Sequence, residues 1–509
     1  MSSTAKLMLR GASLRVIKTI VSIVIGFMMM PFLINQLGDH LYGLWITIGS
    51  VVAAYYLLDL GFSQAVTRYV AKCIHQQDYP GANRIINTAL AIYSALAVLI
   101  ILLTLLLSST AVQSLVENPD DLKLVQILVL ITGIALAFEF PAKAFPGIIN
   151  AYMRYDTTAI VALLKTVIDA VFIYLFIENG YGLVAMAMVG FVTSILSTAF
   201  YMYYCHQLFR QLEYRKENID LETTKEIFNF SKWVFVIDAN RLLKEKMDVW
   251  LIAFYGSAAL VTVYYVAVRL VEYAIQFLVQ ATGISNTLFT KYYALGDEKK
   301  LVWSVNFFVK INCLFTLLFI NGFYLVGFEF ITIWMGKDFE VALAYQCLLI
   351  LAVGKMATYA TAPLGGLLLT IKKHSFSAKL SIVETVISGA LCIWLIPAKG
   401  LVGAAISIAL PLLVTRLIIL PVYTQKHLRF MSLGLLMRLL VTTTLSIFTA
   451  YFLKLFFSPR EAYALKDLLI LSIGYLCLLP ILLLVLLDKD ELLQIKGMIM
   501  KKLKKSPSK

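Results

Sequence analysis

Long apolar stretches alternate with short polar segments along almost the whole chain. Each stretch runs for about 20 residues, the length that an α-helix needs to cross the hydrocarbon core of a bilayer. The pattern predicts an all-α polytopic membrane protein with little chain left for a soluble domain. It predicts about fourteen spans, centred near Ile25, Val52, Ala97, Ile131, Ile173, Val192, Trp250, Phe277, Phe315, Leu351, Ile387, Ala409, Leu445 and Leu476.

One block of these helices occurs twice, with the two copies about 217 residues apart. Pro146 is followed 36 residues later by Gly182, which opens the run GLVAMAM. Pro363 is followed 37 residues later by Gly400, which opens the similar run GLVGAAI. Duplicated halves of this size are typical of transporters that hold their substrate between two lobes.

The duplication predicts three regions. An N-terminal lobe covers residues 1–210 with the first six spans, and a C-terminal lobe covers residues 211–428 with the next six. Residues 429–509 add two further spans and a basic cytoplasmic tail. Since six is even, both lobes enter the membrane from the same side and are related by a pseudo-twofold axis along the membrane normal. The tail after Asp488 predicts either an amphipathic helix on the inner leaflet or a frayed basic end.

Charge is scarce and unevenly distributed. Charged residues make up 15% of the 509 residues and hydrophobic residues 60%, whereas soluble proteins carry about a quarter charged residues. The net charge is +14. If both termini are cytoplasmic, the inner segments carry roughly four Lys or Arg for each one outside. These charges lie on alternating loops rather than on one face, which argues against a nucleic-acid-binding surface.

Ionisable residues within the spans are costly unless they face a cavity or one another. Glu139 and Lys143 are four residues apart, as are Lys165 and Asp169, so each pair is predicted to meet on one helix face. We interpret these two pairs, with Lys310 and Arg438, as structural. Five charges are more isolated in the sequence: Lys310, Lys355, Glu384, Arg416 and Arg438.

A second set of charges favours a water-filled cationic cavity. It lies on the helices that open the two lobes and consists of Arg15, Lys18, Arg241, Lys244 and Arg269. Guanidinium offers bidentate donors and ammonium a point charge, so this set suits phosphate or pyrophosphate. Four carboxyl groups are candidates for ion coupling by H+ or Na+: Asp59, Asp169, Glu272 and Glu384. We find no catalytic nucleophile–base arrangement, ATP-binding loop, metal-ligand spacing or cofactor motif, which predicts a transporter rather than an enzyme.

Several short motifs resemble those of bacterial polysaccharide flippases. They are LGDHLYGLW at residues 37–45, LDLGF at 58–62, TRYVA at 67–71, NGYGL at 179–183 and YVAVRL at 265–270. The chain is similar over nearly its whole length to the O-antigen (Wzx-type) branch of the multidrug/oligosaccharidyl-lipid/polysaccharide (MOP) exporter superfamily. The resemblance implies two six-helix lobes, with helices one and seven bordering the cavity, and two extra C-terminal helices. It also implies a polyprenyl-pyrophosphate-linked oligosaccharide as the cargo.

Together these features predict a flippase of the bacterial inner membrane with both termini in the cytoplasm. It would move the lipid-linked oligosaccharide to the outer leaflet by alternating access, for O-antigen or capsule-like polysaccharide. Membrane lipids, a polymerase and a chain-length regulator are the other expected partners. The chain lacks the proline-rich helix start and the fuller arginine set of the lipid II flippase branch, which makes lipid II a weaker cargo candidate. Two alternatives stay open: a cation-coupled multidrug exporter of the same superfamily, and a membrane enzyme acting on the lipid-linked sugar.

Overall fold

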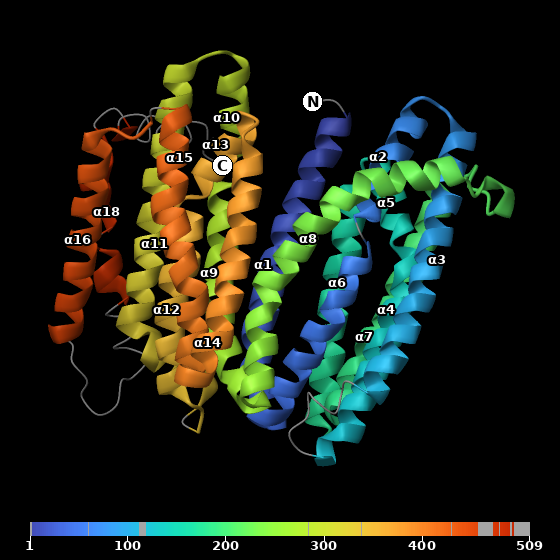
Figure 1. Ribbon diagram of the computed structural model, residues 1–509, viewed down its shortest axis with the longest axis horizontal. Helices are drawn as coiled ribbons and strands as arrows, with labels where there is room; N and C mark the ends of the chain where they lie inside the picture. Colours follow the sequence, from blue (N-terminus) through green and yellow to red (C-terminus); the bar gives the residue numbers. More distant parts are fainter. Residues whose placement is uncertain are drawn as a thin grey trace, which may run out of the picture. The chain divides into compact units, whose positions relative to one another are not determined.

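The computed structural model is built from helices (Figure 1) and describes residues 3–59, 61–110, 119–283, 285–336, 338–428, 430–456, 472–477, 479–488 and 491–492. Ten helical segments among these residues are long and apolar enough to cross a membrane. Two of the ten, Ser13–His75 and His374–His427, contain 63 and 54 residues. Since one crossing needs about 20 residues, each of these two segments is long enough to cross twice. The chain is an all-α multi-pass membrane protein.

Contacts between residues divide the chain into two compact units, Met1–Thr262 and Val263–Lys509. The helices of unit 1 are α1 (Ser3–Ala54), η1 (Tyr55–Asp59), α2 (Phe62–His75), α3 (Tyr79–Ser109), η3 (Pro119–Asp121), α4 (Leu122–Ala142), α5 (Ala144–Ala151), α6 (Tyr155–Glu178), α7 (Gly182–Leu208), η4 (Lys216–Asn218) and α8 (Leu221–Tyr255). Helix α9 (Ala258–Thr282) begins just before the boundary. Unit 2 continues with α10 (Ser285–Ala294), α11 (Glu298–Met335), α12 (Val341–Ala360), α13 (Ala362–Thr370), α14 (His374–Val414), η5 (Thr415–Ile419), α15 (Leu420–His427), α16 (Leu433–Phe456) and α18 (Leu479–Leu486).

The two longest helices bend at glycine residues. Helix α1 has 52 residues and bends at Gly38, where φ is 81° and ψ is 161°. Helix α14 has 41 residues and bends at Gly400, where φ is 57° and ψ is −138°. A residue with a Cβ atom is strained at these backbone angles, whereas glycine, which has none, adopts them readily. Glycine is therefore the residue that permits the bend. Each bend divides one long helix into two segments of different direction.

The two units repeat the same order of elements, which supports the duplication predicted from the sequence. Pro146 lies in α5, a helix of eight residues that follows α4, and Pro363 lies in the first turn of α13, a helix of nine residues that follows α12. Helix α2 packs on α5, and α10 packs on α13. The matched glycines Gly182 and Gly400 both have positive φ, 69° and 57°. The two copies therefore share a glycine of positive φ as well as a hydrophobic pattern.

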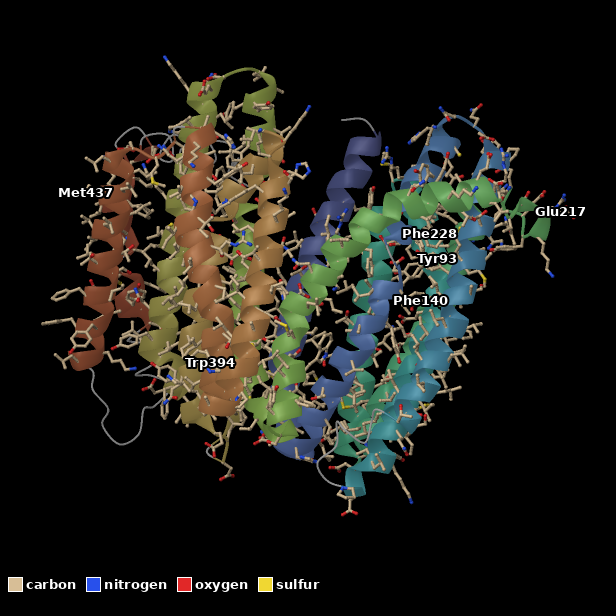
Figure 2. The ribbon with its side chains drawn as sticks, in the orientation of Figure 1. Tyr93, Phe140, Glu217, Phe228, Trp394 and Met437 are labelled. Atoms are coloured by element: carbon tan, nitrogen blue, oxygen red, sulfur yellow. The ribbon has the colours of Figure 1, made fainter. Side chains whose placement is uncertain are left out.

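An aromatic cluster links four helices at the core of unit 1 (Figure 2). The Tyr93 ring of α3 makes edge-to-face contacts with Phe62 at 6.3 Å and with Phe140 at 6.2 Å between ring centres, and Phe62 contacts Phe228 at 4.9 Å. Such contacts stabilise a core beyond the area they bury. The cluster joins α2, α3, α4 and α8, and it fixes the Tyr93 hydroxyl beside the end of η1, where Asp59 lies.

In unit 2 a polar network attaches the C-terminal helices to α11. The Asn321 amide donates to the Ser446 hydroxyl at 2.7 Å and to the Tyr475 hydroxyl at 2.8 Å. Lys310, predicted to be isolated, donates to Asp488 at 2.7 Å and to Glu491 at 2.9 Å. These bonds are consistent with the structural role that we assigned to Lys310. The predicted amphipathic tail falls mostly on residues 493–509, outside the described residues.

Candidate functional site

Three groups of interacting polar side chains lie on the apolar helices of unit 1. The first group surrounds Asp59, whose carboxylate accepts hydrogen bonds from the Tyr93 hydroxyl at 2.8 Å and the Ser63 hydroxyl at 3.0 Å. The Lys143 ammonium lies 3.5 Å from Asp59, and the side chains of both residues are 18% exposed. The ammonium also lies 4.1 Å from the centre of the Phe140 ring. Asp59 is thus a partly buried carboxylate with a cation and two hydroxyl donors around it.

The second polar group joins α4, α6 and α7. Glu139 of α4 and Lys165 of α6 form an ion pair at 3.0 Å, and the Ser194 hydroxyl of α7 contacts both. Asp169 accepts a hydrogen bond of 2.5 Å from the Thr193 hydroxyl on α7.

Neither predicted pairing within one helix, Glu139 with Lys143 or Lys165 with Asp169, forms a direct ion pair among the described residues, although the two charges of each pair lie close enough to interact. Lys143 caps the end of α4 and turns to Asp59, while Lys165 crosses to Glu139. Helices α4 and α6 both pack on α7, so carboxylates on neighbouring helices lie within reach. A spacing of four residues reports only which side chains share a face of one helix.

A cavity of about 200 Å³ lies beside both ion pairs. Glu139, Lys143 and Lys165 line it together with the side chains of Ser197 and Tyr201. Since one water takes about 30 Å³ in the liquid, the cavity has room for several waters or for a small polar group. Charges at this depth that face such a space are typical of transport pathways.

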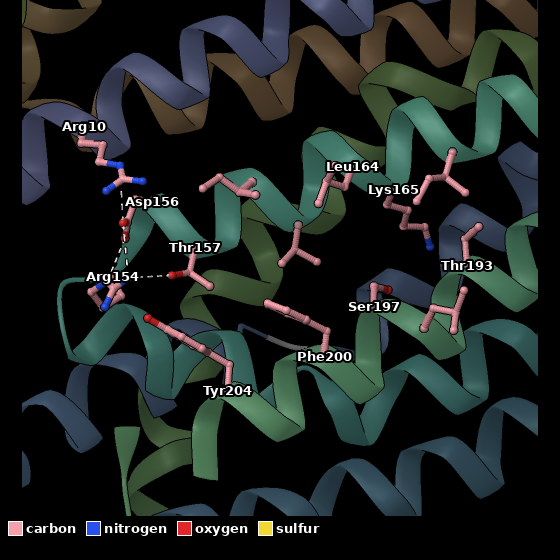
Figure 3. Close-up of a pocket in the computed structure, with 14 residues that line it drawn as sticks. Arg10, Arg154, Asp156, Thr157, Leu164, Lys165, Thr193, Ser197, Phe200 and Tyr204 are labelled. Carbon is pink, nitrogen blue, oxygen red and sulfur yellow. Dashed lines mark hydrogen bonds and ion pairs between the residues drawn. The ribbon is translucent and has the colours of Figure 1, made fainter. Parts of the chain in front are cut away.

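A third polar group lies where α1 meets the start of α6 (Figure 3). The Asp156 side chain is 2% exposed and accepts from Arg154 at 3.0 Å, and Arg10 of α1 lies 3.9 Å away. The guanidinium of Arg15 lies 5.1 Å from the centre of the Tyr155 ring, within cation–π range. Three arginines against one carboxylate give this cluster a net positive charge.

A glycine allows the close packing that forms this cluster. A Cβ atom added at Gly11 would lie 2.9 Å from the Cβ of Tyr155, so a larger residue would push α1 away from α6. The sequence analysis did not predict that Arg10, Arg154 and Asp156 come together. No periodicity could link Arg10 to positions so far along the chain. The only local signal was the charged sequence RYD at the start of the apolar helix α6.

The other cavity cations predicted in unit 1 have mixed surroundings. Lys18 is partly buried on α1. Arg241 of α8 forms an ion pair with Asp238 at 3.1 Å, and its side chain is 68% exposed. Lys244, on the same helix, is also partly buried and makes polar contacts. Because Asp238 neutralises Arg241, the cationic character of unit 1 comes more from α1 than from this pair.

In unit 2 the predicted cavity cation Arg269 contacts other side chains of its own helix, α9. It forms an ion pair with Glu272 at 3.1 Å, and its guanidinium lies 4.8 Å from the Tyr273 ring centre and 5.6 Å from that of Tyr265. The two aromatic faces hold the guanidinium in place, and Glu272 neutralises it. Residues three apart lie on one face of a helix, so Arg269 and Glu272 can meet there, although the sequence analysis did not predict this pair.

Glu384 and Arg416, predicted to be isolated, form a buried ion pair in unit 2 at 2.7 Å. Glu384 is 1% exposed and also accepts a 2.5 Å hydrogen bond from the Thr415 hydroxyl. Thr415 and Arg416 open the π-helical turn η5. Such turns add a residue to a helix and often mark functional positions. In the described part of the chain, no three His, Cys, Asp or Glu side chains gather closely enough to hold a metal ion.

Comparison with known proteins gives the family. The model of the family described as "Polysaccharide biosynthesis protein" matches residues 8–285, more than half of the chain. The chain belongs to this family. It is also 23% identical over 423 residues to the uncharacterized membrane protein EpsK of Bacillus subtilis (strain 168), covering 80% of this chain and 81% of EpsK.

Solved structures show the same fold at low sequence identity. The lipid II flippase MurJ, in an inward closed conformation, matches with a TM-score of 0.68 and 14% identity over 92% of this chain and 98% of MurJ. The Vibrio cholerae MATE transporter VcmN matches with a TM-score of 0.60 and 14% identity over 85% of this chain and 99% of VcmN. The fold is therefore that of the MOP superfamily. The chain therefore combines membership of a polysaccharide biosynthesis family with a fold shared with MurJ and with MATE transporters.

Proposed function

We propose that this protein is a flippase that moves a polyprenyl-pyrophosphate-linked oligosaccharide from the cytoplasmic to the outer leaflet. The observation that carries the proposal is the 200 Å³ cavity of unit 1, where Glu139, Lys143 and Lys165 face open space within helices long enough to span a bilayer. A charged, hydrated head cannot cross hydrocarbon because its desolvation cost is prohibitive. Membership of the polysaccharide biosynthesis family supports a glycan as part of the cargo.

The lysines of the cavity offer a mechanism for holding and releasing the head. Lys143 and Lys165 are each paired with a carboxylate, Asp59 and Glu139. A pyrophosphate that enters would compete with these carboxylates for the ammonium groups. Protonation of Asp59 or Glu139, or binding of Na+ to them, would free the lysines and favour the loaded state. We therefore propose Asp59 as a coupling group, together with Asp169 of the same unit and Glu272 and Glu384 of unit 2.

The five cations chosen from the sequence remain candidates for the pyrophosphate. In unit 1, Arg15 and Lys18 are the stronger candidates, because Arg15 rests on an aromatic ring and forms no ion pair with a carboxylate among the residues that the structure describes. Arg241 and Lys244 of α8 would contribute after Arg241 leaves Asp238. In unit 2, Arg269 would have to leave Glu272 in the same way.

We propose the topology and setting predicted from the sequence. Fourteen crossings would arise if the two longest segments each cross twice and if α8 and Ser472–Leu486 also cross. Six would lie in a lobe of residues 1–210, six in a lobe of residues 211–428 and two after residue 428. Both termini would face the cytoplasm from the bacterial inner membrane. A polymerase and a chain-length regulator for O-antigen or capsule-like polysaccharide would use the flipped product.

A cation-coupled multidrug exporter is the second candidate, because MATE transporters share the fold. Such an exporter would offer unpaired carboxylates to a cationic cargo. In the cavity of unit 1, Glu139 instead pairs with Lys165, and Lys143 neutralises the nearby Asp59. The paired lysines suit an anionic cargo better.

Translocation in proteoliposomes tests the proposal. A fluorescent polyprenyl-pyrophosphate oligosaccharide is placed in both leaflets, and its exposure to a membrane-impermeant quencher is followed over time. We expect wild-type protein to speed the exchange and Lys143→Met to abolish the gain. Lys300→Met is the matched control, because Lys300 also pairs with an aspartate, Asp297 at 2.7 Å, but is 64% exposed at a helix start. No acceleration by wild-type protein, or movement of a cationic dye instead, would contradict the proposal.

A further inference from the structure

Helices α6 and α7 form a long apolar groove on unit 1. One ridge runs along α6 from Ile160 to Phe176 at every fourth residue, and the other runs along α7 from Val184 to Tyr204 at every fourth residue. Residues four apart stack on one side of a helix, so each series forms a continuous ridge. Midway along the groove, Leu164 is 54% exposed and Leu196 is 58% exposed.

The groove is continuous, and its length is close to the thickness of the hydrocarbon core of a bilayer. It consists of a cavity of about 360 Å³ and one of about 540 Å³, which share Ile168, Thr193 and Leu196. The α7 ridge runs over twenty residue steps from Val184 to Tyr204, which at about 1.5 Å per step gives a length of about 30 Å. This equals the thickness of the hydrocarbon core, whereas the acyl chain of one phospholipid covers about half of it.

The hydroxyl groups of Thr193 and Ser197 and the ammonium group of Lys165, which line the middle of the groove, already have partners within the protein. The Thr193 hydroxyl donates to Asp169, and the Ser197 hydroxyl donates to the Ser194 carbonyl at 3.0 Å. Lys165 lines the groove with its stem, while its ammonium pairs with Glu139. Figure 3 shows Leu164 and Phe200 between this lysine and the charged end of the groove.

That charged end is the cluster of Arg10, Arg154 and Asp156 (Figure 3). Two arginines face one buried carboxylate, which leaves one positive charge at the groove mouth. The Arg10 side chain is 64% exposed and lies 3.9 Å from Asp156, so its donors can turn to a phosphate. The groove therefore matches an amphiphile with an anionic head and one very long apolar tail.

We propose that this groove is a loading site for the polyprenyl chain of the cargo, with the diphosphate held at Arg10 and Arg154. This inference rests on the proposed flippase function and adds a tail subsite to it. A tail in lipid is already in an apolar solvent, so the groove gains affinity from close packing rather than from the hydrophobic effect. The arginines supply charge-assisted hydrogen bonds to the head. A polyprenyl chain uses the whole length of the groove, which a single phospholipid chain does not.

Binding to the purified full-length protein in detergent tests this site by native mass spectrometry. The ligands are a long-chain polyprenyl diphosphate without sugar, the short farnesyl diphosphate, the uncharged long-chain polyprenol, and phosphatidylglycerol as competitor. We expect Leu196→Trp, which fills the junction of the two cavities, to weaken binding of the long diphosphate about tenfold. Val171→Trp is the matched control, since Val171 of α6 is 50% exposed and lines neither cavity.

The head is tested by Arg10→Gln, which leaves Asp156 paired with Arg154. It should weaken binding of the long diphosphate about fivefold and leave binding of the polyprenol unchanged. Farnesyl diphosphate should bind more weakly than the long chain. Equal binding by wild type and Leu196→Trp, or displacement of the long diphosphate by an equal amount of phosphatidylglycerol, would overturn the inference.

Translocation by the same variants separates this inference from the proposed function. If wild-type protein moves the cargo and Leu196→Trp binds and moves it equally well, the groove is rejected and the flippase function stands. If wild-type protein binds the long diphosphate through Leu196 but moves no cargo, the groove stands and the flippase function is rejected.

Discussion

In each unit a threonine hydroxyl donates a hydrogen bond to a carboxylate on an apolar helix, but the charged side chains near that carboxylate are arranged differently. In unit 1 Asp169 accepts a hydrogen bond from Thr193 on the next helix, and in unit 2 Glu384 accepts one from Thr415, both at 2.5 Å. In unit 2 Arg416 completes the arrangement as a buried pair, with Glu384 1% exposed and Arg416 13% exposed.

In unit 1 the corresponding charged side chains are more exposed. Lys165 lies one helical turn from Asp169 but pairs with Glu139, and the two side chains of that pair are 29% and 25% exposed beside a cavity. A closed pair can exchange partners only if the helices move, whereas an open pair can exchange its partner for water or ligand. The comparison indicates that the buried Glu384–Arg416 pair contributes more to stability, whereas the open Glu139–Lys165 pair exchanges partners more easily.

The largest expected effect comes from breaking the buried pair of unit 2. Glu384→Ala would leave the guanidinium of Arg416 without its counter-charge and Thr415 without its acceptor, so we expect a loss of about 3–5 kcal/mol in stability. Thermal unfolding of the purified protein in detergent measures it. The double variant Glu384→Leu/Arg416→Leu should recover most of the loss, because no buried charge is left alone. A double variant as unstable as the single one would show that the pair is not the cause.

The helical segments were well predicted from the sequence, whereas the partners of the charges were not. Hydrophobic runs and the matched Gly182 and Gly400 depend on local chain properties, and both glycines have a positive φ. The pair of Arg269 with Glu272 is compatible with a spacing of three residues but was not predicted. Lys165 with Glu139 depends on which helices pack together, and no periodicity within one helix contains that information.

A smaller loss is expected at Lys310 of unit 2. Lys310→Met removes the charged partner of Glu491, which is 3% exposed and accepts from Lys310 at 2.9 Å. A charged hydrogen bond of this kind contributes about 2–3 kcal/mol. The loss should appear in thermal unfolding, and Lys310→Arg should retain part of the stability. If Lys310→Met melts at the same temperature as the wild-type protein, Lys310 does not have the structural role proposed for it in unit 2.

For the open pair of unit 1 we expect a small stability effect and a large transport effect. Lys165→Met should cost only about 1 kcal/mol, because Glu139 keeps the Ser194 hydroxyl and access to water in the cavity. Translocation of the lipid-linked cargo should nevertheless be lost. Val171→Met, on the exposed side of the same helix, controls for substitution in α6. A variant that unfolds like Glu384→Ala, or that transports normally, would remove the distinction between the units.

The smallest effect sharpens the comparison within unit 2, at the half-exposed carboxylate of Asp488. Asp488 follows α18, its side chain is 48% exposed, and it faces Lys310, Arg438 at 2.6 Å and Glu491, whose carboxylate accepts from the Asp488 N–H at 2.8 Å. The hydrogen bond from the Lys310 ammonium holds the pKa of Asp488 below its ordinary value.

A depressed carboxyl pKa stabilises the folded state above the unfolded value, about 3.9 for aspartate, and that contribution is lost as the pH falls through the lower folded value. Asp488→Asn should therefore lower the melting temperature slightly at neutral pH, and its difference from wild type should shrink below about pH 4. In a Lys310→Met background the difference should be smaller and depend less on pH, because the group that lowers the pKa is gone. A difference that stays constant from neutral pH to about pH 3 would show that Asp488 contributes through packing rather than charge.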